Sequence, residues 1–396
     1  MAERRGVISL ILVVLSLSMV TNAAVPAVFI FGDSTADVGT NNNINTSTAR
    51  ADFPQNGIDF PGSVATGRFS NGLNSADFLS KQLGFRRSPP AFLTLLSRKL
   101  NIYKHVQRGV NFASGGSGIL DVTGSAPYTT PYLRLTCIES RQHFHLSTCM
   151  RAKRYRTYYH IYKQGKVIHM GEQIQQFAGV RNILLEFWGQ ETTDSFLSKS
   201  PFFISVGSND IFEYFALNGT SNKEQYMFFL KSTYGNHLRA LYKLGARKFG
   251  IISVPPIGCC PSQRIFNTTG GCLDPLNEYS QMFFVSIQAL LQQLSSEYKD
   301  MKYSLGNAYE MVTSFMENPL PIKIKELKTA CCGGGDFNGE VPCSPSAKVC
   351  SNREEYLFWD LYHPTQAAAE VAALTLYGGG LKFVTPINFK QLAEAD

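Results

Sequence analysis

The 396-residue sequence lacks the signatures of several large protein classes. The glycine-rich run at residues 113–118 has neither the P-loop spacing nor the dinucleotide-binding spacing. After residue 24, no apolar run is long enough to span a bilayer. The two cysteine clusters, at 259–272 and 331–350, have no histidine beside them, which disfavours zinc. We therefore expect no cofactor, no metal and no stable membrane insertion.

The sequence also lacks an even distribution of positive charge. Residues 129–166 hold eight Lys or Arg and one Glu, which alone matches the formal net charge of +7. The rest of the chain is close to neutral. Basicity therefore indicates no nucleic-acid partner and says little about the substrate.

The basic segment 129–166 has no helical or alternating period and is rich in tyrosine and histidine. Basic residues interleaved with aromatic ones are one pattern of RNA binding. An alternative interpretation of the segment is a metal site formed by Cys137, His143, His145 and Cys149. The interpretation we favour is an atypical surface insertion that does not belong to the working fold. Retained non-coding sequence is our hypothesis for its origin.

Residues 1–24 are typical of a secretory signal peptide, with Arg4 and Arg5 before an apolar run and a small-residue exit. We therefore expect a secreted, extracellular protein. Nine cysteines fit an oxidising compartment and predict disulfides in loops, with at least one cysteine unpaired because nine is odd. Sequons predict N-glycosylation at Asn45, Asn218 and Asn267.

Short apolar segments alternate with amphipathic ones after the leader. Strands are predicted at 27–31, 106–112, 201–206, 248–254 and 303–306, and helices at 75–83, 91–100, 171–187, 193–199, 227–244 and 278–300. This order predicts an α/β fold with a parallel sheet covered on both faces. Because no repeat or flexible linker divides the chain, we expect a single domain over residues 25–396.

Three of the predicted strands are followed by residues suited to acyl chemistry. Ser34 follows the first strand, Gly115 the second and Asn209 the third. The carboxyl ends of parallel strands share the sheet edge where open α/β sheets bind ligands. A serine there can act as a nucleophile, while the Ser34 and Gly115 amides and the Asn209 side chain can stabilise an oxyanion. The alternative is that these residues, with Asp33, only cap ordinary turns.

Asp360 and His363 lie three residues apart at the predicted start of a helix. A carboxylate so placed can hold an imidazole in the tautomer that accepts a serine proton. The alternative is a helix cap beside an incidental histidine. Outside the basic segment and His169 just after it, only His105 and His237 compete, and neither has such a carboxylate with a proline-marked turn.

Four blocks of the sequence carry a family resemblance: Phe-Gly-Asp-Ser at 31–34, Gly-Val-Asn-Phe-Ala-Ser-Gly-Gly at 109–116, Val-Gly-Ser-Asn-Asp at 206–210 and Asp-Leu-Tyr-His-Pro-Thr at 360–365. They resemble the blocks of the GDSL-type lipases and esterases, the SGNH hydrolases. Segments 66–72, 255–259 and 330–333 are similar to the plant branch. The likeness covers nearly all of the chain after the leader.

The resemblance implies a flavodoxin-like three-layer α/β/α fold with a five-stranded parallel sheet. It implies Ser34 as nucleophile, His363 and Asp360 as its partners, and Ser34, Gly115 and Asn209 as the oxyanion hole. The departure from the family is segment 129–166, which separates flanks that relatives join over a much shorter distance.

These observations predict a secreted serine hydrolase that cleaves carboxylic esters of small-molecule or lipid acyl groups through an acyl-enzyme. One alternative is an acyltransferase that uses the same residues with an alcohol in place of water. Another is a catalytically silent secreted glycoprotein. Acyl length, disulfide pairing and oligomeric state do not follow from the sequence.

Overall fold

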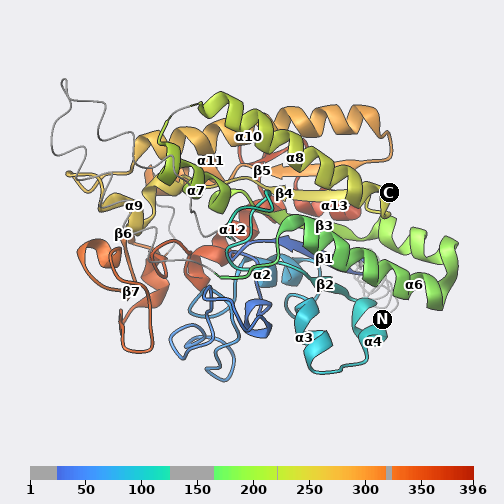
Figure 1. Cartoon of the computed structure of the whole chain (residues 1–396), viewed down its shortest axis with the longest axis horizontal. Helices are drawn as coiled ribbons and strands as arrows, with labels where there is room; N and C mark the ends of the chain where they lie inside the picture. Colours follow the sequence, from blue (N-terminus) through green and yellow to red (C-terminus); the bar gives the residue numbers. More distant parts are fainter. Residues whose placement is uncertain (1–24, 125–164, 221, 318–322) are drawn as a thin grey trace, which may run out of the picture.

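A computed structural model describes residues 25–124, 165–220, 222–317 and 323–396 (Figure 1). The expected leader, nearly all of the insertion, and Cys137 and Cys149 with it lie outside the described residues. None of the described helices combines the length and the apolar character needed to cross a membrane.

A six-stranded sheet forms the centre of the fold, in the order β10-β5-β4-β3-β1-β2. The strands are β1 (Val28–Gly32), β2 (Gly109–Asn111), β3 (Pro201–Ser205), β4 (Lys248–Ile252), β5 (Lys302–Gly306) and β10 (Val384–Thr385). The first five pair in parallel, and β10 runs antiparallel to β5. The parallel strands have the flavodoxin-like order 2-1-3-4-5, which confirms the predicted fold class.

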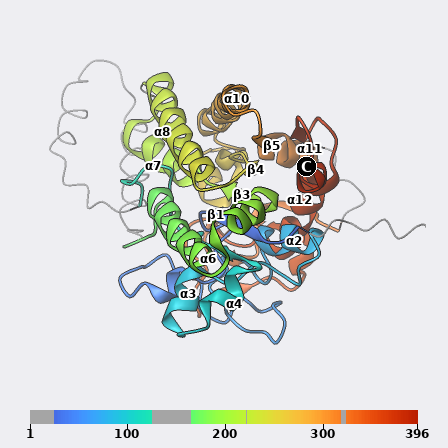
Figure 2. The ribbon, with the colours of Figure 1, turned by 90° about the vertical axis from the view of Figure 1, so that its right-hand side faces the viewer.

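Successive side chains of β1 enter two separate hydrophobic cores. Phe29 and Phe31 pack with α6 (Met170–Lys199), α8 (Lys223–Lys243) and α10 (Asp274–Glu297). Val28 and Ile30 pack on the opposite face with α2 (Ser75–Gln82), α12 (Gln366–Gly378) and α13 (Phe389–Glu394). This alternation follows from the period of two along a strand. Figure 2 shows the two helical layers with the sheet between them.

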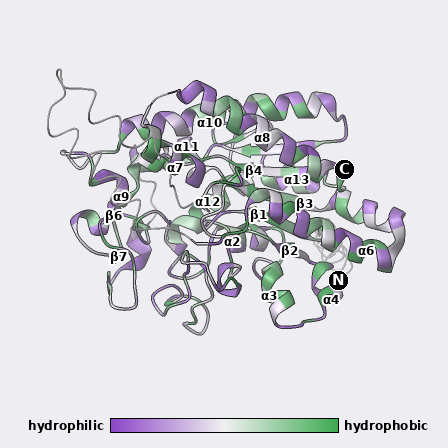
Figure 3. Ribbon diagram, in the orientation of Figure 1, coloured by the Kyte–Doolittle hydropathy of each residue, from purple (hydrophilic) through white to green (hydrophobic). Residues whose placement is uncertain are grey.

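Shorter helices complete the described chain: α3 (Phe92–Ser97), α4 (Ile102–Val106), α7 (Ser208–Asn218), α9 (Pro261–Arg264) and α11 (Ala308–Glu317). Figure 3 shows hydrophobic and hydrophilic residues alternating along the long helices, as expected when one face is buried. The two helices predicted at 171–187 and 193–199 are merged into α6, which is interrupted at Gly189 with φ 75°. The strand predicted at 106–112 is shorter, because α4 extends to Val106.

A cysteine-rich block precedes the last helices. Here β6 (Glu326–Ala330) pairs in parallel with β9 (Tyr356–Phe358), and β7 (Cys332–Gly333) pairs antiparallel with β8 (Lys348–Val349). The disulfides Cys331–Cys350 and Cys332–Cys343 join its strands and loops, and Cys259–Cys272 closes a loop beside α9. The prediction of disulfides is confirmed. Cys260 is a free, buried thiol.

Candidate active site

Ser34 lies just beyond the end of β1, where the backbone must turn sharply. Gly32 has φ 139°, and a Cβ there would come within 2.1 Å of the Ser205 carbonyl oxygen, so only glycine fits. The Asp33 carboxylate accepts hydrogen bonds from the Thr35 amide at 3.0 Å and the Thr35 hydroxyl at 2.8 Å. Asp33 is therefore the turn cap that sequence reasoning considered, while the Ser34 hydroxyl makes a different contact.

That contact is with His363, although the two residues are 329 positions apart in the chain. Ser34 Oγ lies 2.8 Å from His363 Nε2, and His363 Nδ1 lies 2.8 and 2.9 Å from the two carboxylate oxygens of Asp360. Because the ionised carboxylate can only accept, Nδ1 carries the proton and Nε2 accepts from the Ser34 hydroxyl. The structure thus brings the three predicted residues into one hydrogen-bonded row.

The charges of this row stabilise one another in a buried setting. The His363 and Asp360 side chains are each 12% exposed. Burial disfavours the charged imidazole, but the charge and hydrogen bond of Asp360, with a smaller contribution from Asp33, raise the pKa of His363 above its ordinary value. Burial likewise opposes ionisation of Asp360, yet His363 and two backbone amides hold its pKa below the usual range. The His363 imidazole is thus more basic than usual and lies beside an ionised carboxylate.

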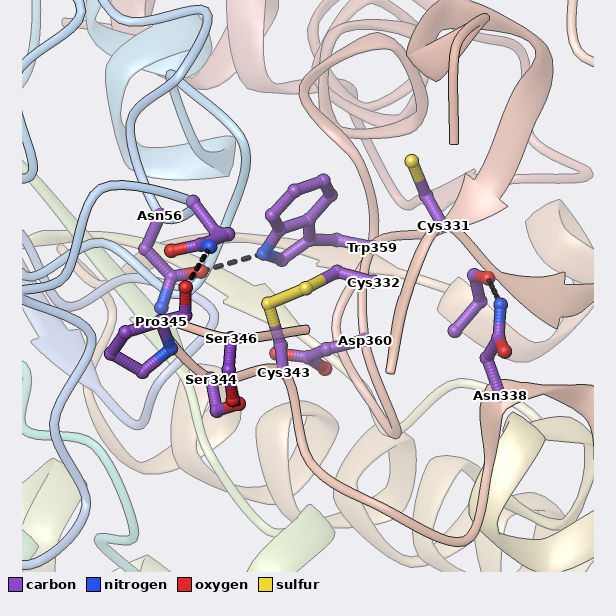
Figure 4. The surroundings of a disulfide bond; sticks show 12 residues. Asn56, Cys331, Cys332, Asn338, Cys343, Ser344, Pro345, Ser346, Trp359 and Asp360 are labelled. Atoms are coloured by element: carbon purple, nitrogen blue, oxygen red, sulfur yellow. Dashed lines mark hydrogen bonds between the residues drawn. A yellow bond between two sulfur atoms is a disulfide. The ribbon is translucent and has the colours of Figure 1, made fainter. Parts of the chain in front are cut away.

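The segment that carries Asp360 and His363 is held by the cysteine-rich block. The amides of Cys331 and Cys332 donate to the Phe358 and Trp359 carbonyls at 3.0 and 2.7 Å. Figure 4 shows the Cys332–Cys343 disulfide beside Trp359, whose indole Nε1 donates to Asn56 at 2.6 Å. Asp360 follows directly. Two disulfides and a strand pairing therefore fix the position of His363.

One predicted oxyanion donor is wrong, namely the amide of Gly115. It donates to the Asp37 carboxylate at 2.9 Å and is therefore not available to a substrate. The next residue, Gly116, lines the cavity together with Ser34 and Asn209. Within the described residues, the Ser34 and Gly116 amides have no hydrogen-bond acceptor. The free amide is that of Gly116 and not of Gly115, because the Asp37 carboxylate already binds the Gly115 amide.

Asn209 follows β3, as the sequence predicts, and lies in the first turn of α7, a helix that the sequence did not predict. Its Nδ2 donates one hydrogen to the Ser117 carbonyl at 2.9 Å, which leaves the second hydrogen for a ligand. Asp210, the next residue, anchors the loop on the other side. It accepts from the Ile119 and Leu120 amides at 2.9 and 3.0 Å. Burial raises the pKa of Asp210 to about 6 despite these bonds.

Sequence reasoning missed two buried polar residues that hold the site together. Asp37 also accepts from the amides of Gly39 and Thr40, both at 2.7 Å, so it ties the loop after β1 to the loop after β2. Its complete burial raises its pKa to about 6, against the lowering effect of those amides. Gln173 of α6 accepts from the Gly32 amide at 2.9 Å.

Through its Nε2, Gln173 also donates to the Gly32 carbonyl at 2.8 Å and to Ser117 Oγ at 3.0 Å. Gln173 therefore binds both backbone polar groups of Gly32, at the Ser34 turn, and also the loop that positions Asn209. A buried polar residue is visible in the sequence only as a polar position within an apolar pattern. Its partners, up to 141 residues away, are not.

Phe69, from the plant-type segment 66–72, covers the site. Its ring centroid lies 5.0 Å from that of His363, and a Cβ on Gly115 would meet the Phe69 ring at 2.5 Å. Its neighbour Arg68 makes a buried, two-point ion pair with Asp77 at 2.7 and 2.8 Å. The Phe69 ring thus packs against both the His363 imidazole and the glycine-rich loop at Gly115.

One cavity of about 540 Å³ extends from these residues along the carboxyl edge of the sheet. Ser34, Gly116, Asn209 and His363 line it at one position, and Phe212 continues its wall along α7. A small molecule in this cavity can reach the Ser34 hydroxyl, the His363 imidazole and the free donors together.

The other predicted residues lie elsewhere. Asn45 is exposed in the loop after β1, and Asn218 is the last residue of α7. Asn267 is half-buried and donates from Nδ2 to the Cys272 carbonyl at 2.9 Å. His237 contacts the Ile119 carbonyl at 2.9 Å, and His105 lies on α4. In the described part of the chain, no group of three or more potential ligands is arranged to hold a metal.

Comparison with known proteins agrees with this geometry. The family described as GDSL-like Lipase/Acylhydrolase matches residues 28–376. The chain is similar to GDSL esterase/lipase At5g55050 of Arabidopsis thaliana, with 32% identity over 94% of this chain and 91% of that protein. It is also similar to GDSL esterase/lipase At5g37690 of the same plant, with 32% identity over 90% of each. This chain belongs to the GDSL-like lipase/acylhydrolase family.

Proposed function

We propose that the protein is a serine hydrolase that cleaves carboxylic esters through an acyl-enzyme formed on Ser34. The observation that carries the proposal is the row Ser34–His363–Asp360, with both hydrogen-bonded contacts of the imidazole within 2.9 Å. Family membership and the names of the relatives, which are esterase/lipases, support the same reaction class.

In the first step, His363 Nε2 removes the proton of Ser34 as Oγ attacks the ester carbonyl carbon. Asp360 keeps the imidazole in the required tautomer and stabilises the imidazolium that forms. The imidazolium then gives its proton to the departing alcohol, and the acyl group remains on Ser34. Water, activated by the same imidazole, releases the acid and restores the serine.

The negative oxygen of the tetrahedral intermediate needs preorganised donors. We assign this role to the amides of Ser34 and Gly116 and to the second hydrogen of Asn209 Nδ2. Gly116 has φ 81°, a conformation that favours glycine. Loss of one such donor lowers kcat by about 10²–10³, so an Asn209→Ala variant is expected to fall in that range.

The decisive experiment compares the purified protein with its Ser34→Ala variant on p-nitrophenyl acetate. Hydrolysis by the wild type and its loss in Ser34→Ala support the proposal, with Ser195→Ala, an exposed serine of α6, as the matched control. Unchanged hydrolysis in Ser34→Ala would refute the assigned nucleophile. Equal, negligible turnover in both proteins would favour a silent binding protein. Adding glycerol and measuring glyceryl ester separates hydrolysis from acyl transfer.

We further propose that the chain enters the secretory route and is extracellular. Three disulfides among the described residues fit an oxidising compartment, as does the leader-like composition of residues 1–24. Exposed Asn45 is the sequon best placed for a glycan, because Asn267 Nδ2 already donates to a backbone carbonyl. Expression in a plant secretory system, followed by N-terminal sequencing and glycosidase treatment of the medium, tests both points.

A further inference from the structure

Positive charge gathers on the two short helices α3 and α4. Figures 1 and 2 both show these helices side by side at one edge of the molecule, and α4 contacts α6. Residues 86–108, which contain both helices, include six Lys or Arg and no Asp or Glu. The six are all exposed: Arg86, Arg87, Arg98, Lys99, Lys104 and Arg108. This one-sided charge stands out because the chain outside residues 129–166 is close to neutral.

None of these six side chains makes an ion pair with another described residue. By contrast, Lys223, Arg239 and Lys323 each pair with a glutamate at 3.0 Å or less. Glu186, an exposed acid on α6, pairs with none of the six either. The positive charge of residues 86–108 is therefore available to a partner outside the chain.

The turn between α3 and α4 has a lysine where glycine is usual. The Lys99 amide donates to the Leu96 carbonyl and the Leu100 amide to the Leu95 carbonyl, both at 3.1 Å, which is the Schellman motif. Lys99 has φ 49°, and this left-handed position of the motif is most often a glycine. The sequence keeps a cation where glycine would fit with less strain, which favours a role for that charge.

Large apolar side chains are exposed on the same elements. Leu96 is 48% exposed, Leu100 39% and Phe187 57%. The ring centroids of Phe187 and Tyr103 are 4.1 Å apart, and the Tyr103 hydroxyl accepts from Trp188 Nε1 at 2.9 Å. These ring contacts join α6 to α4. Tyrosine and tryptophan, each with an apolar body and a polar tip, are typical of membrane interfaces.

We call this surface the α3–α4 face and define it by six residues: Leu96, Arg98, Lys99, Leu100, Lys104 and Phe187. We propose that the α3–α4 face docks the protein on a bilayer that contains anionic lipids. Its cations complement the negative headgroups, and its apolar side chains can enter the interface beneath them. The attachment is peripheral and reversible. A dissolved polyanion would use the cations and leave the leucines in water, so the exposed leucines favour lipid.

The α3–α4 face is linked to the cavity that contains the nucleophile. Asn43, in the loop after β1, donates to Thr94 Oγ1 at 3.0 Å and accepts from Ser97 Oγ at 2.7 Å, both on α3. Thr48 and Arg50, a few residues further along the same loop, line the cavity. A bilayer held at this face is thus connected to the cavity through one short segment. The docking itself goes beyond the proposed reaction and does not depend on it.

Co-sedimentation with vesicles made of equal parts of phosphatidylcholine and phosphatidylglycerol tests the cations. In Arg98→Gln/Lys99→Gly/Lys104→Gln we expect the partition coefficient to fall by about 100-fold, because each Lys or Arg near an anionic surface contributes about fivefold. Glycine at position 99 removes the charge and suits the turn. Circular dichroism during heating establishes that the variant is folded.

The matched control is Lys243→Gln/Lys299→Gln/Lys328→Gln, which removes the same charge from exposed positions outside the face. Its partition coefficient should stay within about threefold of wild type, because salt screens charges that lie beyond a Debye length. Equal losses in the two triple variants would show that net charge alone drives binding and would overturn the proposal. So would equal binding of the wild type to vesicles of phosphatidylcholine alone.

The leucines separate a bilayer from a dissolved polyanion. In Leu96→Ser/Leu100→Ser we expect the partition coefficient to fall by about tenfold, because two apolar side chains no longer transfer from water into the interface. Leu374→Ser/Leu381→Ser is the control, since these leucines are 50% and 73% exposed on other elements. Unchanged vesicle binding in the first variant, with polygalacturonate competing for the cations, would assign the face to an acidic polymer and overturn the lipid proposal.

Tryptophan fluorescence locates the contact. The chain has two tryptophans, half-buried Trp188 beside the face and fully buried Trp359. Bromine-labelled phosphatidylcholine in the anionic vesicles should quench the wild type more than Trp188→Phe, and equal quenching would contradict the proposal. Hydrolysis of p-nitrophenyl acetate should be the same in the cation variant and the wild type, because no residue of the face lines the cavity. A failed docking test therefore leaves the proposed function untouched.

Discussion

The two halves of the candidate active site are held in place by different kinds of interaction. The Ser34 half is fixed by buried hydrogen bonds, in which the Asp37 carboxylate and the Gln173 amide bind backbone groups of the surrounding loops. The His363 half is fixed by the pairing of Cys331 and Cys332 with the segment before Asp360, and both cysteines are in disulfides. One half therefore depends on desolvated polar contacts and the other on covalent cross-links.

The difference teaches that the two halves should respond to different perturbations. An isosteric amide in place of the Asp37 carboxylate acts on these buried hydrogen bonds and should loosen the Ser34 half. Reduction acts on the cysteine-rich block and should loosen the His363 half. The catalytic row fails in either case, because it needs both halves.

Asp360→Asn should have the largest effect, since it removes the charge from the His363 half without changing its shape. An amide in this position favours the wrong imidazole tautomer, so kcat on p-nitrophenyl acetate should fall by about 10⁴. Asp336→Asn, an exposed aspartate in the same block, serves as the control. A loss of less than tenfold in Asp360→Asn would mean that this carboxylate does not orient the base.

Cys331→Ser/Cys350→Ser should destabilise the His363 half by removing one cross-link. The two cysteines are 19 residues apart, and a loop of this length contributes about 3 kcal/mol to the free energy of unfolding. Urea denaturation followed by fluorescence measures the loss. Treating the wild type with dithiothreitol should lower its activity by more than the Asp37→Asn substitution lowers it, when both activities are measured at the same temperature. Equal stability of the double variant and the wild type would show that strand pairing alone holds this half.

Asp37→Asn should loosen the Ser34 half by a smaller amount. The asparagine side chain has one acceptor oxygen where the carboxylate has two, so it cannot accept from all three backbone amides as well as Asp37 does. Each buried donor left without an acceptor costs about 1–3 kcal/mol. We expect that loss in the free energy of unfolding, together with a fall in kcat of about tenfold. Asp194→Asn, which weakens only the half-exposed contacts of Asp194 with Arg181 and Gln190, is the control and should change stability by less than about 1 kcal/mol. Similar losses in both variants would contradict the anchoring role of Asp37.

The smallest effect is a shift in the pH profile. His363 must be neutral to accept the Ser34 proton, so kcat/KM should rise with pH through an apparent pKa above the ordinary value of 6.5, because Asp360 raises the pKa of the imidazole. Asp360→Asn removes that charge and should move the midpoint downward by about one unit in its residual activity. Asp37→Asn should leave the midpoint in place. A midpoint that moves in Asp37→Asn instead would couple the two halves electrostatically.

The sequence predicted the central parallel strands better than the short elements α7 and β10. Apolar runs that end at Gly32 and Gly207 indicated the central strands, and the residues after them lie where the parallel order requires. Helix α7 was not predicted, because Gly207, Ser208 and Asn209 are also typical of a turn. Strand β10 consists of Val384–Thr385 alone, which is too short for any pattern to reveal.

In the site, the residues with a chemical signature were predicted and those with a supporting role were not. Asp360 and His363 are close in sequence, so their spacing indicated a pair. Asp37 and Gly115 are 78 residues apart, and no local pattern shows that the carboxylate occupies that amide. The choice between Gly115 and Gly116 depends on this single contact. A long-range hydrogen bond is a property of the fold and is not encoded in spacing.

The separation of 329 residues between Ser34 and His363 has a consequence for biosynthesis. At a translation rate of about 5–20 residues per second, the base is made roughly 16 to 66 seconds after the nucleophile. During this interval the growing chain carries a serine with no partner to remove its proton. An unfinished chain therefore lacks the complete row that the proposed reaction requires. Activity arises only when the polypeptide has closed on itself, so the linear order of the blocks acts as a safeguard in time.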